Sequence, residues 1–267
     1  MTDARLPAAY LSAGGTSFTA FLQAVRPDLL PRAEALPHAA GDLAPHGTTI
    51  VALASADALV MAGDRRATMG HFIASRDMEK VFVTAERSLA GIAGSAGVGI
   101  ELIRLFRVEL EHYEKLEGVV MSLQGQANRL AAMVRANLSL AMQGLAAVPI
   151  FGGYDDEREQ VRLWSFDATG GSYAEREHHS IGSGSLAARG ALKKLWRPGL
   201  TTAEALAVAI EALYDAADDD TATGGPDLAR GVWPTVAIAD ADGARFIPSA
   251  EVGAVVAEVV TRREAPR

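Results

Sequence analysis

The sequence of 267 residues contains no cysteine, which excludes disulfide bonds, thiolate catalysis and cysteine-ligated zinc. It has no long cluster of lysine and arginine and carries a net charge of −8, so we expect no nucleic-acid partner. No apolar run approaches the roughly 20 residues that cross a bilayer. The N-terminus also lacks the basic start and apolar core of a secretory signal. These absences predict a protein without a membrane segment, located in the cytoplasm.

The content of apolar residues, 49%, is sufficient for a large buried core, and the length suits one large domain or two small ones. Residues 1–47 differ from the rest because they are rich in alanine, glycine and proline. Helical spacing appears only where Phe18, Phe21, Leu22 and Val25 share one face. Two interpretations stay open for residues 1–47: a disordered tail, or a pro-segment that is removed. In the second interpretation, residues 48–267 form the functional domain.

From Thr48 onward, the pattern predicts strands, two helices, strands, two helices, strands and a final helix. Short strands are expected up to Gly97, then helices over 98–117 and 122–142 and strands over 148–154, 161–167 and 175–181. Further helices are expected up to Trp196 and over 203–217, the second capped by Thr202, followed by strands over 232–239 and 245–247 and a helix from 251. Runs of like elements favour an α+β fold over βαβ units. We therefore expect two antiparallel sheets face to face, with helices on their outer faces.

Thr48 follows the separable segment and begins the first core strand. Glycine and threonine at a strand start are common, so Gly47 and Thr48 alone indicate no function. Cleavage of the Gly47–Thr48 bond, however, would give Thr48 both a hydroxyl and a free α-amine. An α-amine with a pKa of about 7.7–8.0 acts as a base near neutral pH. A threonine activated in this way is a known nucleophile.

Three more residues at strand ends have a possible role beside Thr48. Lys80 would by default be solvated, but as a neighbouring cation it would lower the pKa of the Thr48 amine. Asp64 precedes two arginines and either pairs locally or anchors Lys80. Gly94 either makes a tight turn or offers an open N–H to a developing oxyanion.

Two later motifs have competing interpretations. Asp218, Asp219 and Asp220 lie at a helix C-terminus, where the helix dipole prefers cations, so they form a frayed acidic cap, a divalent-metal site or part of a functional site. Residues 182–187 fit a loose dinucleotide-binding fingerprint with Glu204 downstream, but the required βαβ unit is absent. His178 and His179 are expected on the surface.

Taken together, these motifs resemble the β-type subunits of the proteasome, and most of all the actinobacterial form. The resemblance rests on residues 46–51, 63–68, Lys80, Ala93-Gly94, 182–185 and 220–225, and it covers residues 48 to about 250. It implies the N-terminal-nucleophile hydrolase fold, a four-layer αββα sandwich of two antiparallel sheets between helix layers. It also implies self-cleavage between Gly47 and Thr48, without a metal or another cofactor.

The resemblance also implies roles for individual residues. Thr48 would be the nucleophile, Asp64 and Lys80 the charge relay assisted by Arg66, and the Gly94 N–H the oxyanion donor. Ser183, Asp220 and Thr223 would organise the amine and its water. Thr68 and Ala96 would hold the substrate backbone, and the pocket before the cut would be lined by Ala67, Met78, Ile92 and Ala96. Because this lining is small or apolar, we expect cleavage after hydrophobic residues.

The family works as stacked seven-membered rings, with β-type rings inside and α-type rings outside. The implied partners are therefore α-type subunits, further copies of this chain, an ATP-driven unfolding ring and unfolded protein substrates. Two alternatives remain: a catalytically silent ring subunit that keeps residues 1–47, and a small-molecule amidase of the same fold. The complete set of Thr48, Asp64 and Lys80 argues against the silent subunit.

Overall fold

The strand β1 (Thr49–Ala54) has apolar side chains on both faces, so it must be covered on both sides. In the computed structural model, which describes residues 47–264, Ile50 packs between two sheets and Val51 packs against helices. The next strand, β2 (Leu59–Gly63), repeats this division with Met61 and Val60. Since side chains alternate along a strand, each strand lies between two apolar layers.

The strands form two five-stranded antiparallel sheets. In the first sheet, the order is β10 (His178–Gly182), β1, β2, β11 (Thr235–Asp240) and β12 (Gly243–Phe246). In the second, it is β5 (Val81–Ala85), β6 (Ser88–Gly94), β7 (Ala147–Asp155), β8 (Gln160–Phe166) and β9 (Ser172–Glu175). A separate hairpin, which the sequence analysis did not predict, joins β3 (Ala67–Met69) to β4 (Phe72–Ser75).

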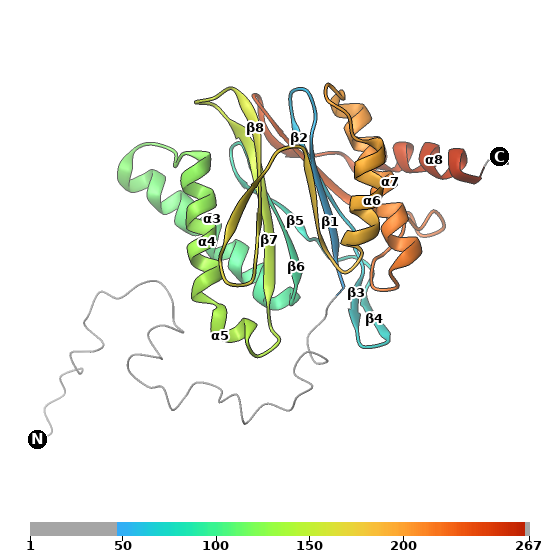
Figure 1. Cartoon of the computed structure of the whole chain (residues 1–267), viewed down its shortest axis with the longest axis horizontal. Coiled ribbons are helices and arrows are strands. Elements are labelled where there is room, and N and C mark those ends of the chain that lie inside the picture. The colour runs from blue at the N-terminus through green and yellow to red at the C-terminus, as the bar shows by residue number, and fades with distance from the viewer. Residues whose placement is uncertain (1–46, 265–267) are drawn as a thin grey trace, which may run out of the picture. The chain divides into compact units, whose positions relative to one another are not determined.

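Helices cover the outer face of each sheet (Figure 1). The first sheet packs against α6 (Ser185–Leu195), α7 (Thr202–Asp219) and α8 (Ser249–Glu264). The second packs against α3 (Ala96–Glu117) and α4 (Leu123–Ala136), and a short α5 (Leu138–Ala141) follows. Three buried apolar clusters therefore separate four layers. The expected α+β fold with an αββα arrangement is confirmed.

The two sheets approach closely where β1 crosses β6. Gly91 of β6 lies against Ile50 of β1, and a Cβ at Gly91 would lie 2.8 Å from two carbon atoms of the Ile50 side chain. Ile50 is fully buried. The absence of a side chain at Gly91 therefore sets how near the sheets come at this point.

Three expected elements differ from the observed ones. The helix expected over 122–142 ends at Ala136, because Asn137 leaves the helical conformation (φ −93°, ψ 10°). The strand expected over 175–181 is divided into β9 and β10, which belong to different sheets. The N-cap of α7 is Thr201 and not Thr202: Thr201 and Glu204 form a capping box in which each side chain accepts the backbone N–H of the other.

The pro-segment predicted for residues 1–47 lies almost wholly outside the described residues, as does the helical stretch expected at residues 18–25, so both stay predictions. Among the helices of residues 47–264, none is both long enough and apolar enough to cross a membrane. His178 and His179 are half-buried in β10, not on the surface as expected. The ring of His178 packs edge-on against Trp196.

Candidate active site

Thr48, Asp64 and Lys80 meet where three strands begin or end. Thr48 directly precedes β1, and Asp64 directly follows the antiparallel β2, so the pairing of these strands brings both to one edge. Lys80 directly precedes β5 of the second sheet. All three side chains are buried. The convergence that the spacing of the strands made possible is therefore observed.

Asp64 accepts hydrogen bonds from four donors. Its Oδ1 accepts from Nζ of Lys80 at 2.7 Å and from the N–H of Thr49 at 2.8 Å. Its Oδ2 accepts from the N–H groups of Arg66 and Gly224, both at 2.9 Å. A carboxylate has about four acceptor positions, so every acceptor position of Asp64 is occupied. Asp64 pairs with Lys80, and not with the two arginines that follow it in the sequence.

The side chain of Lys80 is 4% exposed, so it is not the solvated lysine expected by default. Burial lowers the pKa of Lys80, although the Asp64 carboxylate acts to raise it. Besides Asp64, Nζ donates to the carbonyl oxygen of Gly47 at 2.9 Å and to that of Arg66. Three oxygen atoms thus satisfy the three N–H donors of the ammonium group.

The bond between Gly47 and Thr48 lies within this cluster. The hydroxyl of Thr48 donates a 2.7 Å hydrogen bond to the carbonyl oxygen of Gly47, the same atom that Lys80 contacts. Gly47 has a φ of +93°, and a Cβ there would lie 2.7 Å from Oγ1 of Thr68 and 2.8 Å from the carbonyl oxygen of Ala222. Residues other than glycine would be strained in this position. A hydroxyl and an amine donor therefore face one carbonyl group.

Asp220 is connected to Thr48 through Ser183. Oδ2 of Asp220 accepts from the hydroxyl of Ser183 at 2.5 Å and from that of Thr223 at 2.6 Å. The N–H of Ser183 in turn donates to the carbonyl oxygen of Thr48 at 2.9 Å. Partial burial acts to raise the pKa of Asp220, but the hydrogen bonds from Ser183, Thr223 and the N–H of Ala222 outweigh it, so the pKa lies below its ordinary value.

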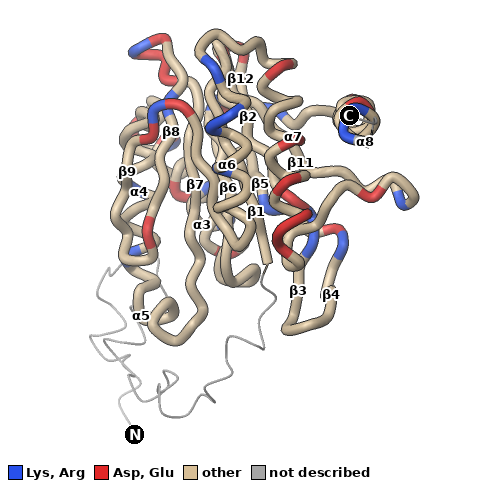
Figure 2. The backbone as a smooth tube through the Cα atoms, turned by 45° about the vertical axis from the view of Figure 1, so that its right-hand side comes forward, with Lys and Arg blue, Asp and Glu red and all other residues tan. Residues whose placement is uncertain are grey.

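The side chain of Arg66 reaches toward the same end of α7. Its Nη1 donates to the carbonyl oxygen of Thr221 at 2.9 Å, while its own carbonyl oxygen accepts from Lys80. Acidic residues at the C-terminal end of α7 thus lie beside basic residues at the entry to β3 (Figure 2). Arg66 contributes to the cluster through its backbone and by fixing the loop after Asp220.

Two members of this network were missed in the sequence. The hydroxyl of Thr49 lies 2.6 Å from that of Thr223 and accepts from the N–H of Gly184 at 3.0 Å. Because the Thr223 hydroxyl donates its single hydrogen to Asp220, the Thr49 hydroxyl is the donor in its bond with Thr223.

Gly224 was also missed in the sequence. A Cβ at Gly224 would lie 2.8 Å from the Cβ of Arg66, so a side chain there would push the Gly224 N–H away from Asp64. Neither role has a local signal in the sequence.

A small pocket opens beside Thr48 and Lys80. Its lining includes three of the predicted substrate-contacting residues, Met78, Ile92 and Ala96, and also Gly94. The remaining lining residues, Glu79, Phe82 and Ile100, were not predicted. Gly94 has a φ of +102°, and a Cβ there would lie 2.2 Å from the carbonyl oxygen of Ala146. Ala67 is buried in β3, and Thr68 lies against Gly47; neither lines this pocket.

Comparison with known proteins gives a consistent result. The profile of the family described as "Proteasome subunit" matches residues 44–227. "Proteasome subunit beta" of Acidothermus cellulolyticus is 57% identical over 267 residues, covering 98% of this chain and 92% of that protein. "Proteasome subunit beta" of Stackebrandtia nassauensis is 55% identical over 264 residues, covering 97% and 95%. The chain therefore belongs to the proteasome subunit family, among its β-type members.

Proposed function

We propose that this β-type subunit is a threonine endopeptidase that frees its own nucleophile by cleaving the Gly47–Thr48 bond. The observation that carries the proposal is the buried cluster in which the Thr48 hydroxyl and Nζ of Lys80 both donate to the carbonyl oxygen of Gly47. Asp64 neutralises Lys80 and fixes it there. Family membership supports a peptidase, and the cluster supports this particular nucleophile.

In the first reaction, Oγ1 of Thr48 attacks the carbonyl carbon of Gly47. Negative charge develops on the carbonyl oxygen, which Nζ of Lys80 stabilises as a hydrogen-bond donor. The C–N bond then breaks, an ester to Oγ1 forms, and the proton of the hydroxyl passes to the departing nitrogen. Water hydrolyses the ester, which leaves a carboxyl group on Gly47 and a free hydroxyl and α-amine on Thr48.

In the second reaction, the free amine of Thr48 acts as the base for its own hydroxyl. The neighbouring ammonium of Lys80 favours the neutral, basic form of this amine. Oγ1 attacks the carbonyl carbon of a substrate peptide, the N–H of Gly94 donates to the oxyanion, and water releases the product from the ester. Ser183 and Asp220 hold the amine and its water, and Thr223 holds Asp220.

The pocket beside Thr48 supports a preference for hydrophobic residues before the cut. Met78, Phe82, Ile92 and Ile100 give it an apolar lining, and Glu79 is an exposed residue of this lining. We expect Thr68 and Ala96 to hold the substrate backbone. The proposed substrates are unfolded proteins in the cytoplasm, which an ATP-driven ring delivers to a particle built from this chain and α-type subunits.

Co-expression with an α-type subunit tests the proposal. Mass spectrometry should find a chain that begins at Thr48, and the particle should hydrolyse a fluorogenic peptide that ends in a hydrophobic residue. Thr48→Ala should abolish both reactions, whereas Thr48→Ser, which keeps a hydroxyl, should retain both at a reduced rate. An intact N-terminus in the assembled wild-type particle would instead support the catalytically silent ring subunit.

A further inference from the structure

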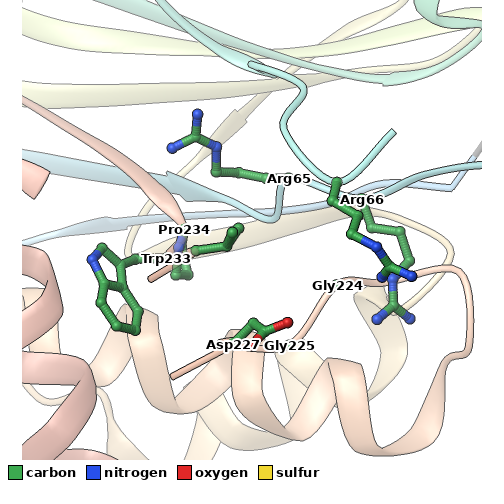
Figure 3. A pocket seen from close by; sticks show the side chains of 9 residues that line it. Arg65, Arg66, Gly224, Gly225, Asp227, Trp233 and Pro234 are labelled. Carbon is green, nitrogen blue, oxygen red and sulfur yellow. The ribbon is translucent and has the colours of Figure 1, made fainter. Parts of the chain in front are cut away.

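A second cleft is lined by Arg66 and Gly224, whose N–H groups donate to Oδ2 of Asp64. Its lining includes Arg65, Arg66, Arg76 and Trp233 (Figure 3). The cleft is open to solvent and has a cavity volume of about 30 Å³, so a side chain of a bound peptide would remain partly exposed there. Figure 3 shows Arg66 above Gly224 on one side of the cleft, with Trp233 and Pro234 on the opposite side.

Positive charge dominates this cleft. Asp227 is the acidic residue among those that line it, and its carboxylate is already bonded to Arg230 at 2.7 Å. Within residues 47–264, Arg76 has no hydrogen-bond or ion-pair partner, and Nε of Arg65 is buried without an acceptor. Arg65 is otherwise ion-paired with Asp77, and Arg66 donates to the carbonyl oxygen of Thr221. In a chain with a net charge of −8, the unpaired Arg76 beside two further arginines favours an anionic ligand.

The carboxylate of Asp64 connects this cleft to the reaction centre. Its Oδ1 faces Lys80, which lines the apolar pocket beside Thr48. Its Oδ2 faces the N–H groups of Arg66 and Gly224, which line the arginine cleft. The two recesses therefore flank one side chain. A peptide that places the residue before the cut in the apolar pocket continues past Thr48, and the arginine cleft is the second recess that borders the same carboxylate.

We propose that the arginine cleft is a subsite for the leaving side of the substrate and selects a carboxylate side chain there. The inference rests on the proposed peptidase function. Guanidinium groups bind carboxylates through paired N–H donors, and Arg76 is free to do so. The ring of Trp233 offers an apolar surface for the stem of a glutamate. The subunit thus prefers substrates with a hydrophobic residue before the cleaved bond and an acidic residue after it.

Internally quenched peptides test this subsite in the assembled, processed particle. One series carries glutamate at each of the first four positions after the cut, and a matched series carries glutamine. We expect kcat/KM to be about fivefold higher for glutamate than for glutamine at one of these positions, because a partly exposed ion pair contributes that much. The preference should decline as the salt concentration rises.

Variants connect the preference to the cleft. Arg76→Gln should reduce the ratio of glutamate to glutamine cleavage to about one, and Arg76→Lys should restore most of it. Arg176→Gln is the matched control: this exposed arginine lies between β9 and β10, by the end of β1 opposite to Thr48, and should leave the ratio unchanged.

The outcomes separate the subsite from the proposed function. If the glutamine peptides are not cleaved at all, the peptidase assignment fails. If they are cleaved but the ratio stays within twofold of one at all four positions, the subsite is refuted. A preference that persists in Arg76→Gln would also overturn the proposal, because the selecting charge would then lie elsewhere.

Discussion

At the scale of single residues, the site depends on one buried ion pair. Lys80 contacts Asp64 and the Gly47 carbonyl oxygen, and its side chain is only 4% exposed, so water can do little to replace these partners. A buried ion pair stabilises little in itself, but removal of one partner leaves an uncompensated charge. Variants at this pair therefore need separate measurements of stability and activity.

Lys80→Met should remove the ammonium while keeping the length of the side chain. We expect it to abolish self-cleavage and peptide hydrolysis and to lower the free energy of unfolding by about 3 kcal/mol, because Asp64 loses its counter-ion. Circular dichroism during denaturation measures the stability, and mass spectrometry measures the cleavage. Lys194→Met, on an exposed part of α6, should change neither. Ordinary activity in the folded Lys80→Met particle would disprove the proposed role.

Thr223 should influence how the protein responds to acid. Because the pKa of Asp220 is below its ordinary value of 3.8 in the folded state, its contribution to stability is present above that pH and is lost as the pH falls through the folded pKa. Thr223→Val removes one donor to Asp220, so the pKa should rise and acid unfolding should begin at a higher pH. Thr223→Ser keeps the donor and should behave as wild type. Equal acid midpoints for the valine and serine variants would contradict this account.

Residue types and spacing indicated a possible site at Thr48, Asp64, Lys80 and Gly94, and the family resemblance suggested their roles. The structure brings these residues together from the ends of strands in two different sheets, which strand spacing alone does not predict. Residue types and spacing were not sufficient for Thr49 or Gly224, whose contacts join positions far apart in the chain. Such contacts follow from the way α7 and its loop pack against β1 and β2. No local pattern contains that information.

At the scale of elements, α7 positions Asp220 at its C-terminal end and is fixed at its N-terminal end by Thr201 and Glu204. Thr201→Ala should remove the cap and lower the free energy of unfolding by about 1 kcal/mol. Chemical denaturation measures this change, with Thr201→Ser as the control that keeps the hydroxyl. Peptide hydrolysis should be unaffected in both variants, because the cap lies at the far end of the helix from Asp220. A loss of activity in Thr201→Ala at full stability would contradict that separation.

Element boundaries were predicted less well than element types. The spacing from Thr201 to Glu204 is that of a capping box, and this signal would have placed the cap correctly. Asn137 ends α4 because its short polar side chain competes with the helical backbone; its Nδ2 donates to the carbonyl oxygen of Met133. The change of sheet between β9 and β10 has no such local cause, since it depends on β10 pairing with β1.

At the scale of the whole molecule, the alternation of apolar residues and the order of elements predicted the four layers, because strands that are apolar on both faces must be covered twice. This pattern did not predict the distance between the two sheets. This distance depends on side chains that meet across the sheets, such as Ile50 against Gly91.

A double-mutant cycle across the two sheets tests this contact. Gly91→Ala should cost about 1–3 kcal/mol of stability through overpacking, and Ile50→Ala about 2–5 kcal/mol through a cavity. The double variant should cost less than the sum, because the new methyl group occupies space that Ile50 vacates. Denaturant unfolding measures all three. Strict additivity would show that the sheets adjust their separation freely at this point.

Gly47 has one more consequence under the proposed mechanism. Its carbonyl oxygen holds the ammonium of Lys80, and its backbone fills the narrow space between Thr68 and Ala222. An incoming peptide would need that same space, so the unprocessed chain inhibits itself as a tethered pseudosubstrate. The subunit is then activated by a single irreversible cleavage of its own Gly47–Thr48 bond. The time of this cleavage, and not the amount of subunit present, determines when protein degradation begins.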